Sequence, residues 1–253
     1  MRGAQRMRYA AGRAARRLGL RDDRLSPLDD FHNWDYLRHN QRRQEHLASL
    51  GLPLDGRSVL ETGAGIGDHT TFFLDRGSTV VVTEARPENL EILRKRFPTL
   101  EVADLDLDRP DPAFTRECEV VYCYGTLYHL ARPAEALAFL ADRCSDLFLL
   151  ETWVSPAQGE SVDIVDEAQT MPSQAFSGHG SRPTRAWVLA RLREHFPHAY
   201  LTTTQPWHEE FPIDWTAEFT NPRKPTRAVF VASRTPIDSA LLTEAVPMQQ
   251  RRH

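Results

Sequence analysis

The chain has 253 residues, of which 41% are hydrophobic, and its formal net charge at pH 7 is −4. This length and hydrophobic content suit one α/β domain with insertions, and no apolar run is long enough to cross a bilayer. The three cysteines lack C-x-x-C spacing and the ten histidines form no H-E-x-x-H motif, so we expect a cytoplasmic protein with reduced thiols and no metal.

The first 24 residues carry eight arginines against two aspartates, a net charge of +6, so the rest of the chain carries about −10. Such a segment suggests a nucleic-acid or membrane-surface arm, or a cleaved transit peptide. However, it has little serine, its one aromatic residue is Tyr9, and the acidic body behind it would repel phosphate backbones. We interpret residues 1–28 as a flexible basic arm, and we expect neither nucleic acid nor a membrane as a partner.

Residues 29–50 have apolar side chains at helical spacing, which predicts one continuous helix. His32, His39 and His46 recur every seven residues within it. This spacing puts the three imidazoles on a shared face and does not by itself indicate a ligand set.

A predicted strand at residues 57–62 leads into a glycine-rich loop, a helical stretch to Gly77 and a β-branched run that ends at Glu84. This layout is typical of a nucleotide-binding α/β unit, whose glycines admit the ligand and whose final acid binds ribose hydroxyls. A dinucleotide fingerprint would place glycine at position 68, where this chain has Asp68. Glu61 would also repel a pyrophosphate, whereas a ligand with an amino group and a sulfonium would be attracted to it.

Glu61, Gly63, Gly65 and Gly67 match E/D-x-G-x-G-x-G without a gap, so the chain resembles the class I S-adenosylmethionine (SAM) dependent methyltransferases over roughly residues 30–232. The resemblance implies SAM as the cofactor and an α/β fold with a doubly wound, mostly parallel sheet. The implied sheet has seven strands in the order 3-2-1-4-5-7-6, with the last strand antiparallel and the 29–50 helix as part of a lid. The implied cofactor-binding residues are Glu61, Gly63, Ala64, Gly65, Gly67, Glu84, Ala85, Asp104, Leu105 and Tyr124.

Further matches follow in the family's order, with strands predicted at residues 101–105, 118–124 and 146–151 and a helix at 134–143. In the family, the acid in the position of Asp104 contacts the adenine amine. The segment that contains His129 resembles the loop beside the transferred methyl group. An alcohol or phenol acceptor needs a base, and His129 is the first candidate, followed by His179 and His208.

Two connections are longer or richer in aromatic residues than a compact domain needs, at residues 152–183 and 205–215. We predict that together they form the acceptor pocket. The alternatives are a solvated loop for the first and a small satellite core for the second. The predicted substrate-binding residues are Trp153, Arg182, Trp207, His208 and Phe211.

A helix at 185–195 and strands at 199–203 and 227–232 complete the predicted domain, which spans residues 29–233. The remaining residues, 234–253, have no clear periodicity, and we expect them to be disordered.

Methyl transfer from SAM chiefly requires alignment of the nucleophile and exclusion of water. We therefore expect a SAM-dependent methyltransferase that acts on an O or N nucleophile of a small molecule, such as a secondary metabolite or sugar. Two alternatives stay open. Leu127–His129 also resembles the enzymes that carboxymethylate the tRNA wobble uridine with carboxy-SAM, and a non-catalytic SAM-binding protein would keep the same cofactor residues.

Overall fold

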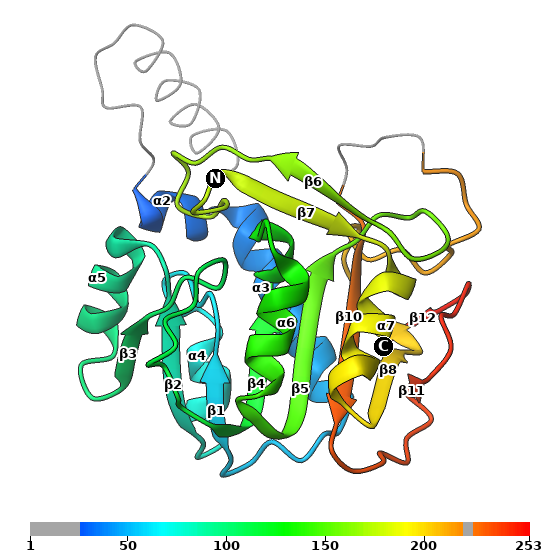
Figure 1. Ribbon diagram of the computed structural model, residues 1–253, viewed down its shortest axis with the longest axis horizontal. Coiled ribbons are helices and arrows are strands. Elements are labelled where there is room, and N and C mark those ends of the chain that lie inside the picture. The colour runs from blue at the N-terminus through cyan, green and yellow to red at the C-terminus, as the bar shows by residue number, and fades with distance from the viewer. Residues whose placement is uncertain (1–25, 220–224) are drawn as a thin grey trace, which may run out of the picture.

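The computed structural model describes residues 26–219 and 225–253, so most of the predicted arm at residues 1–28 lies outside the described residues. In the described part, an eight-stranded sheet lies between two layers of helices (Figure 1). Its strands, in their order across the sheet, are β11 (Leu242–Thr243), β8 (His198–Thr202), β10 (Arg227–Ser233), β5 (Cys144–Trp153), β4 (Cys118–Tyr124), β1 (Ser58–Glu61), β2 (Thr79–Glu84) and β3 (Glu101–Asp104).

The strand directions confirm the predicted doubly wound topology. The first five strands pair in parallel, whereas β10 is antiparallel to both β5 and β8. With β8 as the sixth strand and β10 as the seventh, the order is 3-2-1-4-5-7-6, as predicted. The short strand β11 adds an eighth member at the edge by pairing with β8.

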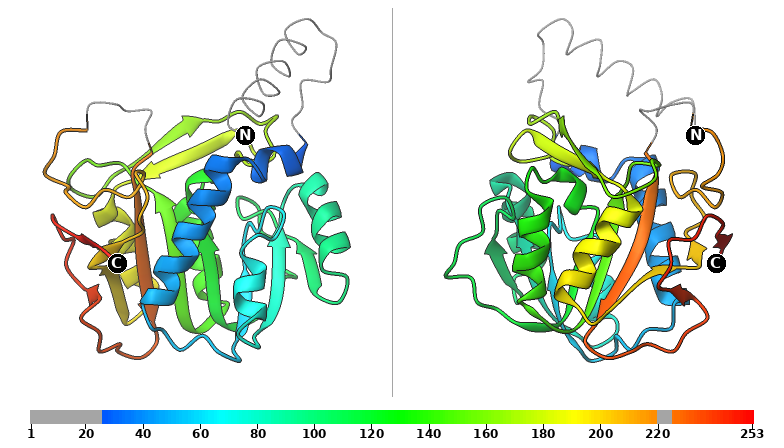
Figure 2. Two further views of the ribbon diagram at one scale, coloured as in Figure 1. Left: turned by 180° about the vertical axis from the view of Figure 1, so that it is seen from behind. Right: turned by 45° about the vertical axis from the view of Figure 1, so that its right-hand side comes forward.

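The helices cover both faces of the sheet (Figures 1 and 2). Side chains of α3 (Trp34–Ser49), α4 (Thr70–Leu74) and α5 (Pro87–Arg96) share one core cluster, and those of α6 (Pro133–Ala141) and α7 (Arg185–His195) share the other. In β1, Val59 belongs to the first cluster and Leu60 to the second, and neither is exposed. The central strands are therefore apolar on both faces, as parallel strands between two helical layers must be.

The prediction of one helix over residues 29–50 is wrong, because the chain forms two helices there. α2 (Pro27–Phe31) ends before Asn33, whose side chain accepts a hydrogen bond from the N–H of Tyr36 at 2.9 Å and caps the start of α3. An asparagine in extended conformation is a favoured N-cap, so a new helix begins here. The break turns α2 over the glycine loop, where Phe31 becomes part of the site described below.

The connection predicted as a loop at residues 152–183 contains a β-hairpin of β6 (Val162–Asp166) and β7 (His179–Pro183). The prediction of a disordered tail is also wrong. Besides β11, the tail contributes β12 (Arg251–Arg252), which pairs with β9 (Thr204–Gln205). The buried side chain of Gln250 donates to Thr202 O at 2.6 Å and accepts from the Trp215 indole at 2.6 Å. These contacts are tertiary, so periodicity within the tail could not indicate them.

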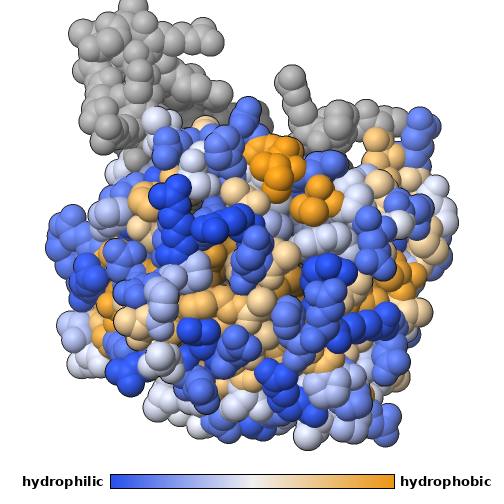
Figure 3. Space-filling model, viewed as in Figure 1, coloured by the Kyte–Doolittle hydropathy of each residue, from blue (hydrophilic) through white to orange (hydrophobic). Residues whose placement is uncertain are grey.

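The face seen in Figure 3 mixes many hydrophilic residues with scattered hydrophobic ones. Within residues 26–219 and 225–253, each helix is too short or too polar to cross a membrane.

Candidate functional site

A pocket lies between the carboxyl ends of β1, β2 and β4 and an opposite wall made of α2 and residues 172–177. It encloses about 640 Å³ of space, including the part open to solvent. The carboxyl edge of a doubly wound sheet, on both sides of the first strand, is where such folds bind nucleotides. The predicted residues that line this pocket are Gly63, Gly65, Glu84, Ala85, Leu105 and His129.

The glycine loop follows β1 and has no room for side chains at the positions that face the pocket. Gly63 and Gly65 both have a φ of +60°, which residues with a Cβ rarely adopt. A Cβ atom on Gly65 would lie 2.7 Å from the Phe31 ring of α2, and one on Gly63 would collide with Thr126. The loop therefore fits closely between α2 and the segment after β4, and glycine is required for steric reasons.

Glu84, at the end of β2, receives hydrogen bonds from three backbone N–H groups. Its carboxylate accepts from Gly65 at 2.8 Å, Ala85 at 2.9 Å and Arg86 at 3.0 Å. Burial raises the pKa of Glu84, while these three bonds favour the ionised form. The carboxylate thus ties the glycine loop to the end of β2 and also borders the pocket.

At the end of β3, the structure differs from the prediction that Asp104 belongs to the cofactor site. Asp104 is exposed at the end of β3 and does not border the pocket, whereas Leu105 and Asp106 do. The Arg86 guanidinium donates to the carbonyl oxygens of Gln169, Gln174 and Ala175 at 2.9 to 3.0 Å. Arg86 therefore holds the connection between β6 and β7 against the pocket.

A second, deeper chamber lies next to the first and has about 340 Å³ of space, including the part open to solvent. Phe31, Tyr36 and Gly63 line both chambers. Predicted residues Glu61, Ala64 and Tyr124 line it. Four buried polar atoms of its lining residues have no hydrogen-bond partner among the described residues: Arg43 Nε, Asp68 Oδ2, His69 Nε2 and Tyr124 Oη. Buried polar groups are normally paired, so this chamber offers both donors and acceptors to a polar ligand.

Glu61 lies in this chamber and accepts a hydrogen bond from the Thr70 hydroxyl at 2.6 Å. Burial raises the pKa of Glu61 to about 7, and the Thr70 bond opposes part of that rise. The carboxylate has no cationic partner within the described residues, so a positively charged group in the chamber would stabilise its ionised form.

His129 ends the short 3₁₀ helix η1 (Leu127–His129) that follows β4. Its Nδ1 lies 2.5 Å from the Glu167 carboxylate. Burial lowers the pKa of His129, and the charges of Arg227 and Arg182 act in the same direction against the influence of Glu167. Glu167 itself is buried, but hydrogen bonds from His129, Ala175 N–H and Arg182 lower its pKa to about 2. A neutral imidazole therefore donates Nδ1–H to an ionised carboxylate, which leaves Nε2 able to accept a proton.

The residues predicted to form the acceptor pocket separate into two groups. Arg182 stacks on Trp153 at 3.8 Å and donates to Glu167 at 3.0 Å, so these two predicted residues lie behind His129. Trp207 is 57% exposed and donates its indole N–H to His253 O, and Phe211 is fully buried in the core.

The two remaining histidines also lie away from the pocket. His179 is exposed at the start of β7 and pairs with Asp166 at 3.1 Å, and it does not border the pocket. His208 packs against His39 with a ring-centroid distance of 4.8 Å. The predicted assembly of both loops into one acceptor pocket is therefore wrong for Trp207, Phe211, His179 and His208, because each packs elsewhere.

Sequence reasoning missed Glu167, Arg86 and Phe31 as site residues. Glu167 is one of four acidic residues within residues 160–167, and only its pairing with His129 distinguishes it from the other three. Arg86 could have been suspected from its place two residues after Glu84. Phe31 had no signal of its own, because its position depends on the break between α2 and α3.

Residues 34–197 match the family described as "Methyltransferase domain". The chain is 34% identical over 90 residues to an uncharacterized methyltransferase of Mycobacterium bovis. The aligned residues are 36% of each protein, so the match spans about a third of that relative's length. Among solved structures, it is similar to the N-terminal domain of EvdMO1 with SAH bound (TM-score 0.58, 20% identity, 89% of this chain and 96% of that one). It is also similar to 1,6-didemethyltoxoflavin-N1-methyltransferase of Burkholderia thailandensis (TM-score 0.55, 19% identity, 91% and 90%).

The family match covers well over half of the chain, and the similar structures share its fold. The chain therefore belongs to the methyltransferase domain family and has the fold of class I methyltransferases.

Proposed function

We propose that this protein transfers a methyl group from SAM to an oxygen or nitrogen nucleophile of a small molecule, with His129 as the general base. The observation that carries the proposal is the His129–Glu167 pair, of which His129 borders the pocket at the carboxyl end of β4. SAM supplies an activated methyl group when bound, so the protein has to orient both partners, exclude water and remove one proton.

The two neighbouring chambers suit the two ends of SAM. Glu84 borders the first chamber, where its carboxylate would accept hydrogen bonds from ribose hydroxyls. Leu105 borders the same chamber and offers an apolar contact to the adenine. The polar groups of the deeper chamber fit an amino acid: the carboxylates of Asp68 and Glu61 suit its ammonium, while Arg43 and Tyr124 suit its carboxylate.

Within this arrangement, Glu167 is a positioning residue. Its carboxylate fixes the Nδ1–H tautomer of His129, and Arg182 and Ala175 N–H hold that carboxylate in place at 3.0 Å each. His129 Nε2 would take the proton of the acceptor as the methyl group is transferred. A base of this kind contributes roughly 10² to 10⁴-fold in rate.

A small acceptor is favoured by the closed wall of residues 172–177 and by the structural neighbours. The EvdMO1 domain was also crystallised in the presence of D-fucose, and the Burkholderia enzyme with bound 1,6-didemethyltoxoflavin. Both ligands are compact polar molecules with ring systems.

The test measures S-adenosylhomocysteine formed from SAM with a panel of sugars, phenols and small amines, and with tRNA as a separate arm. We expect turnover with a small molecule, a loss of roughly 10² to 10⁴-fold for His129→Asn, and a smaller loss for Glu167→Gln. His179→Asn is the matched control, because this histidine lies outside the pocket.

The pH profile separates positioning from a merely structural role for Glu167. Without its charge, the pKa of His129 falls further, so the acid limb of kcat/KM should move to lower pH in Glu167→Gln. Turnover with tRNA alone, or SAM binding without any turnover, would overturn the proposal. Full activity of His129→Asn would overturn the assignment of the base.

A further inference from the structure

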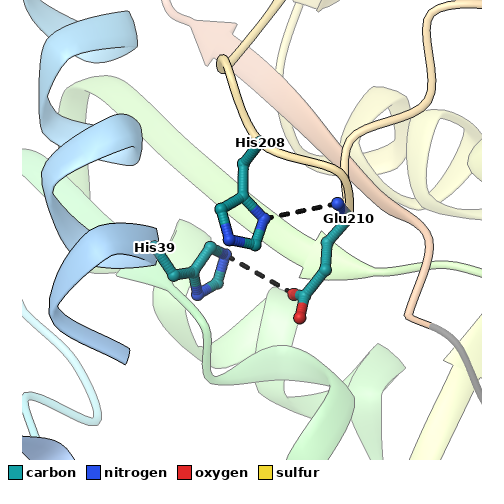
Figure 4. A group of neighbouring side chains, drawn as sticks. All are labelled: His39, His208 and Glu210. Carbon is teal, nitrogen blue, oxygen red and sulfur yellow. Dashed lines mark hydrogen bonds and ion pairs between the residues drawn. The ribbon is translucent and has the colours of Figure 1, made fainter. Parts of the chain in front are cut away.

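Two histidines and a glutamate meet in the interior, away from the pocket, although they are far apart in the sequence. His39 comes from α3, and His208 and Glu210 come from the connection between β9 and β10 (Figure 4). One nitrogen of each imidazole and one carboxylate oxygen all lie within 4.8 Å of one another. The two histidines are only 6% and 5% exposed.

In this cluster, one nitrogen of each imidazole is not paired with a protein group. Nε2 of His39 and Nε2 of His208 are both buried without a hydrogen-bond partner among the described residues. The distance from His39 Nε2 to Glu210 Oε2 is 3.7 Å, and that from His208 Nε2 to Glu209 Oε2 is 3.8 Å, both too long for hydrogen bonds. Leaving two buried polar atoms unpaired at one place is costly, unless a ligand completes the site.

We propose that His39, His208 and Glu210 form a zinc site that ties α3 to the connection between β9 and β10. Two imidazoles and a carboxylate are a donor set that zinc accepts, whereas magnesium and calcium prefer oxygen ligands. Oε2 of Glu209 lies 3.8 Å from His208 Nε2, so this oxygen would be the fourth ligand.

The geometry requires a small contraction. On a tetrahedral zinc ion with bonds of about 2.0–2.1 Å, neighbouring ligand atoms are about 3.4 Å apart, so these side chains would move inward by roughly an ångström. Coordination by Nε2 of His208 would also place a proton on its Nδ1, which now accepts a long hydrogen bond of 3.3 Å from the Glu210 N–H. That weak bond would be lost on metal binding.

The charges around the cluster permit a cation. Arg227 donates to Oε2 of Glu210 at 2.7 Å and also pairs with Glu151. Oε2 is also the oxygen that lies 3.7 Å from His39 Nε2, so zinc would bind this carboxylate beside the bond from Arg227. Arg38 is paired with Glu209. The arginines nearest to a zinc ion at this site therefore already have carboxylate partners.

The test uses full-length protein without a histidine tag, stripped with EDTA, dialysed and titrated with ZnCl₂ by calorimetry. Metal content after gel filtration is measured by mass spectrometry. We expect one zinc per chain and a higher Tm with zinc, because a ligand that binds only the folded state stabilises it. His39→Gln/His208→Gln should lose both the bound zinc and the Tm increase, and MgCl₂ should not substitute.

His179→Gln is the matched control, since it removes an exposed histidine outside the cluster and should keep zinc binding. Circular dichroism and SAM affinity show whether the double variant is folded, and the single variants His39→Gln and His208→Gln replace it if it is not. Zinc binding no stronger in the parent protein than in these variants would overturn the proposal, as would an equal Tm increase in both.

Discussion

Glu61 provides a quantitative test of the deeper chamber, because burial shifts its pKa to about 7. The perturbation is Glu61→Gln, studied across pH 6 to 8. A cationic ammonium beside Glu61 requires the ionised carboxylate, so SAM affinity should fall as the pH drops below about 7. One pKa unit corresponds to about 1.4 kcal/mol, so each pH unit below 7 should weaken the parent protein roughly tenfold relative to the variant.

The same shift has an effect of opposite sign on the stability of the ligand-free protein. The folded state raises the pKa of Glu61 from 4.5 to about 7, so it holds a proton that the unfolded chain has already released. This contribution is fully present below pH 4.5 and is lost as the pH rises to 7, a change of about 3 kcal/mol. At pH 8, Glu61→Gln should therefore be more stable than the parent protein although it binds SAM more weakly.

Calorimetry with SAM at several pH values and urea denaturation at pH 5 and pH 8 measure the two effects. The amine of SAM titrates equally in the measurements on parent and variant, so the comparison of the two proteins isolates Glu61. Glu91→Gln is the control, because Glu91 is an exposed carboxylate that pairs with Lys95. If parent and Glu61→Gln show the same pH dependence of SAM affinity, the reasoning about this carboxylate is refuted.

Three further predictions follow from the site. Gly65→Val should abolish SAM binding in calorimetry while the far-UV circular dichroism stays native, since its Cβ would lie 2.7 Å from Phe31; normal binding would show that the loop has been misplaced. Glu84→Ala should weaken the affinity for SAM at least tenfold. It should also lower the free energy of unfolding in urea by about 1–3 kcal/mol for each of the three backbone N–H groups left unpaired. Unchanged values of both quantities would contradict the role given to the Glu84 carboxylate. Trp207→Ala should keep kcat/KM for the acceptor within about twofold because the side chain is exposed. Arg182→Ala should lower kcat/KM because the Glu167 carboxylate loses a partner. Equal effects of the two substitutions would argue against placing Arg182 beside the site and Trp207 away from it.

The elements of the sheet and the cofactor loop could be predicted from local sequence. The strands read as apolar runs because both of their faces are buried, and Pro87 and Gly77 mark the beginning of one helix and the end of another. The glycine loop is recognisable because steric demands on a backbone at φ near +60° leave few residue types. Each of these signals is a short-range property of consecutive residues.

The chemistry of the site depends instead on contacts between residues that are far apart in the chain. Glu167 was one acid among several until the hairpin of β6 and β7 placed it against His129, 38 residues away. His39 and His208 come together only because α3 packs beside the connection that precedes β10. The sequence around a charged residue or a histidine is the same whether its side chain is solvated or paired. Local motifs, and the resemblance they carry, therefore predict the fold and the cofactor. Tertiary packing alone decides which polar side chains can take part in binding or catalysis.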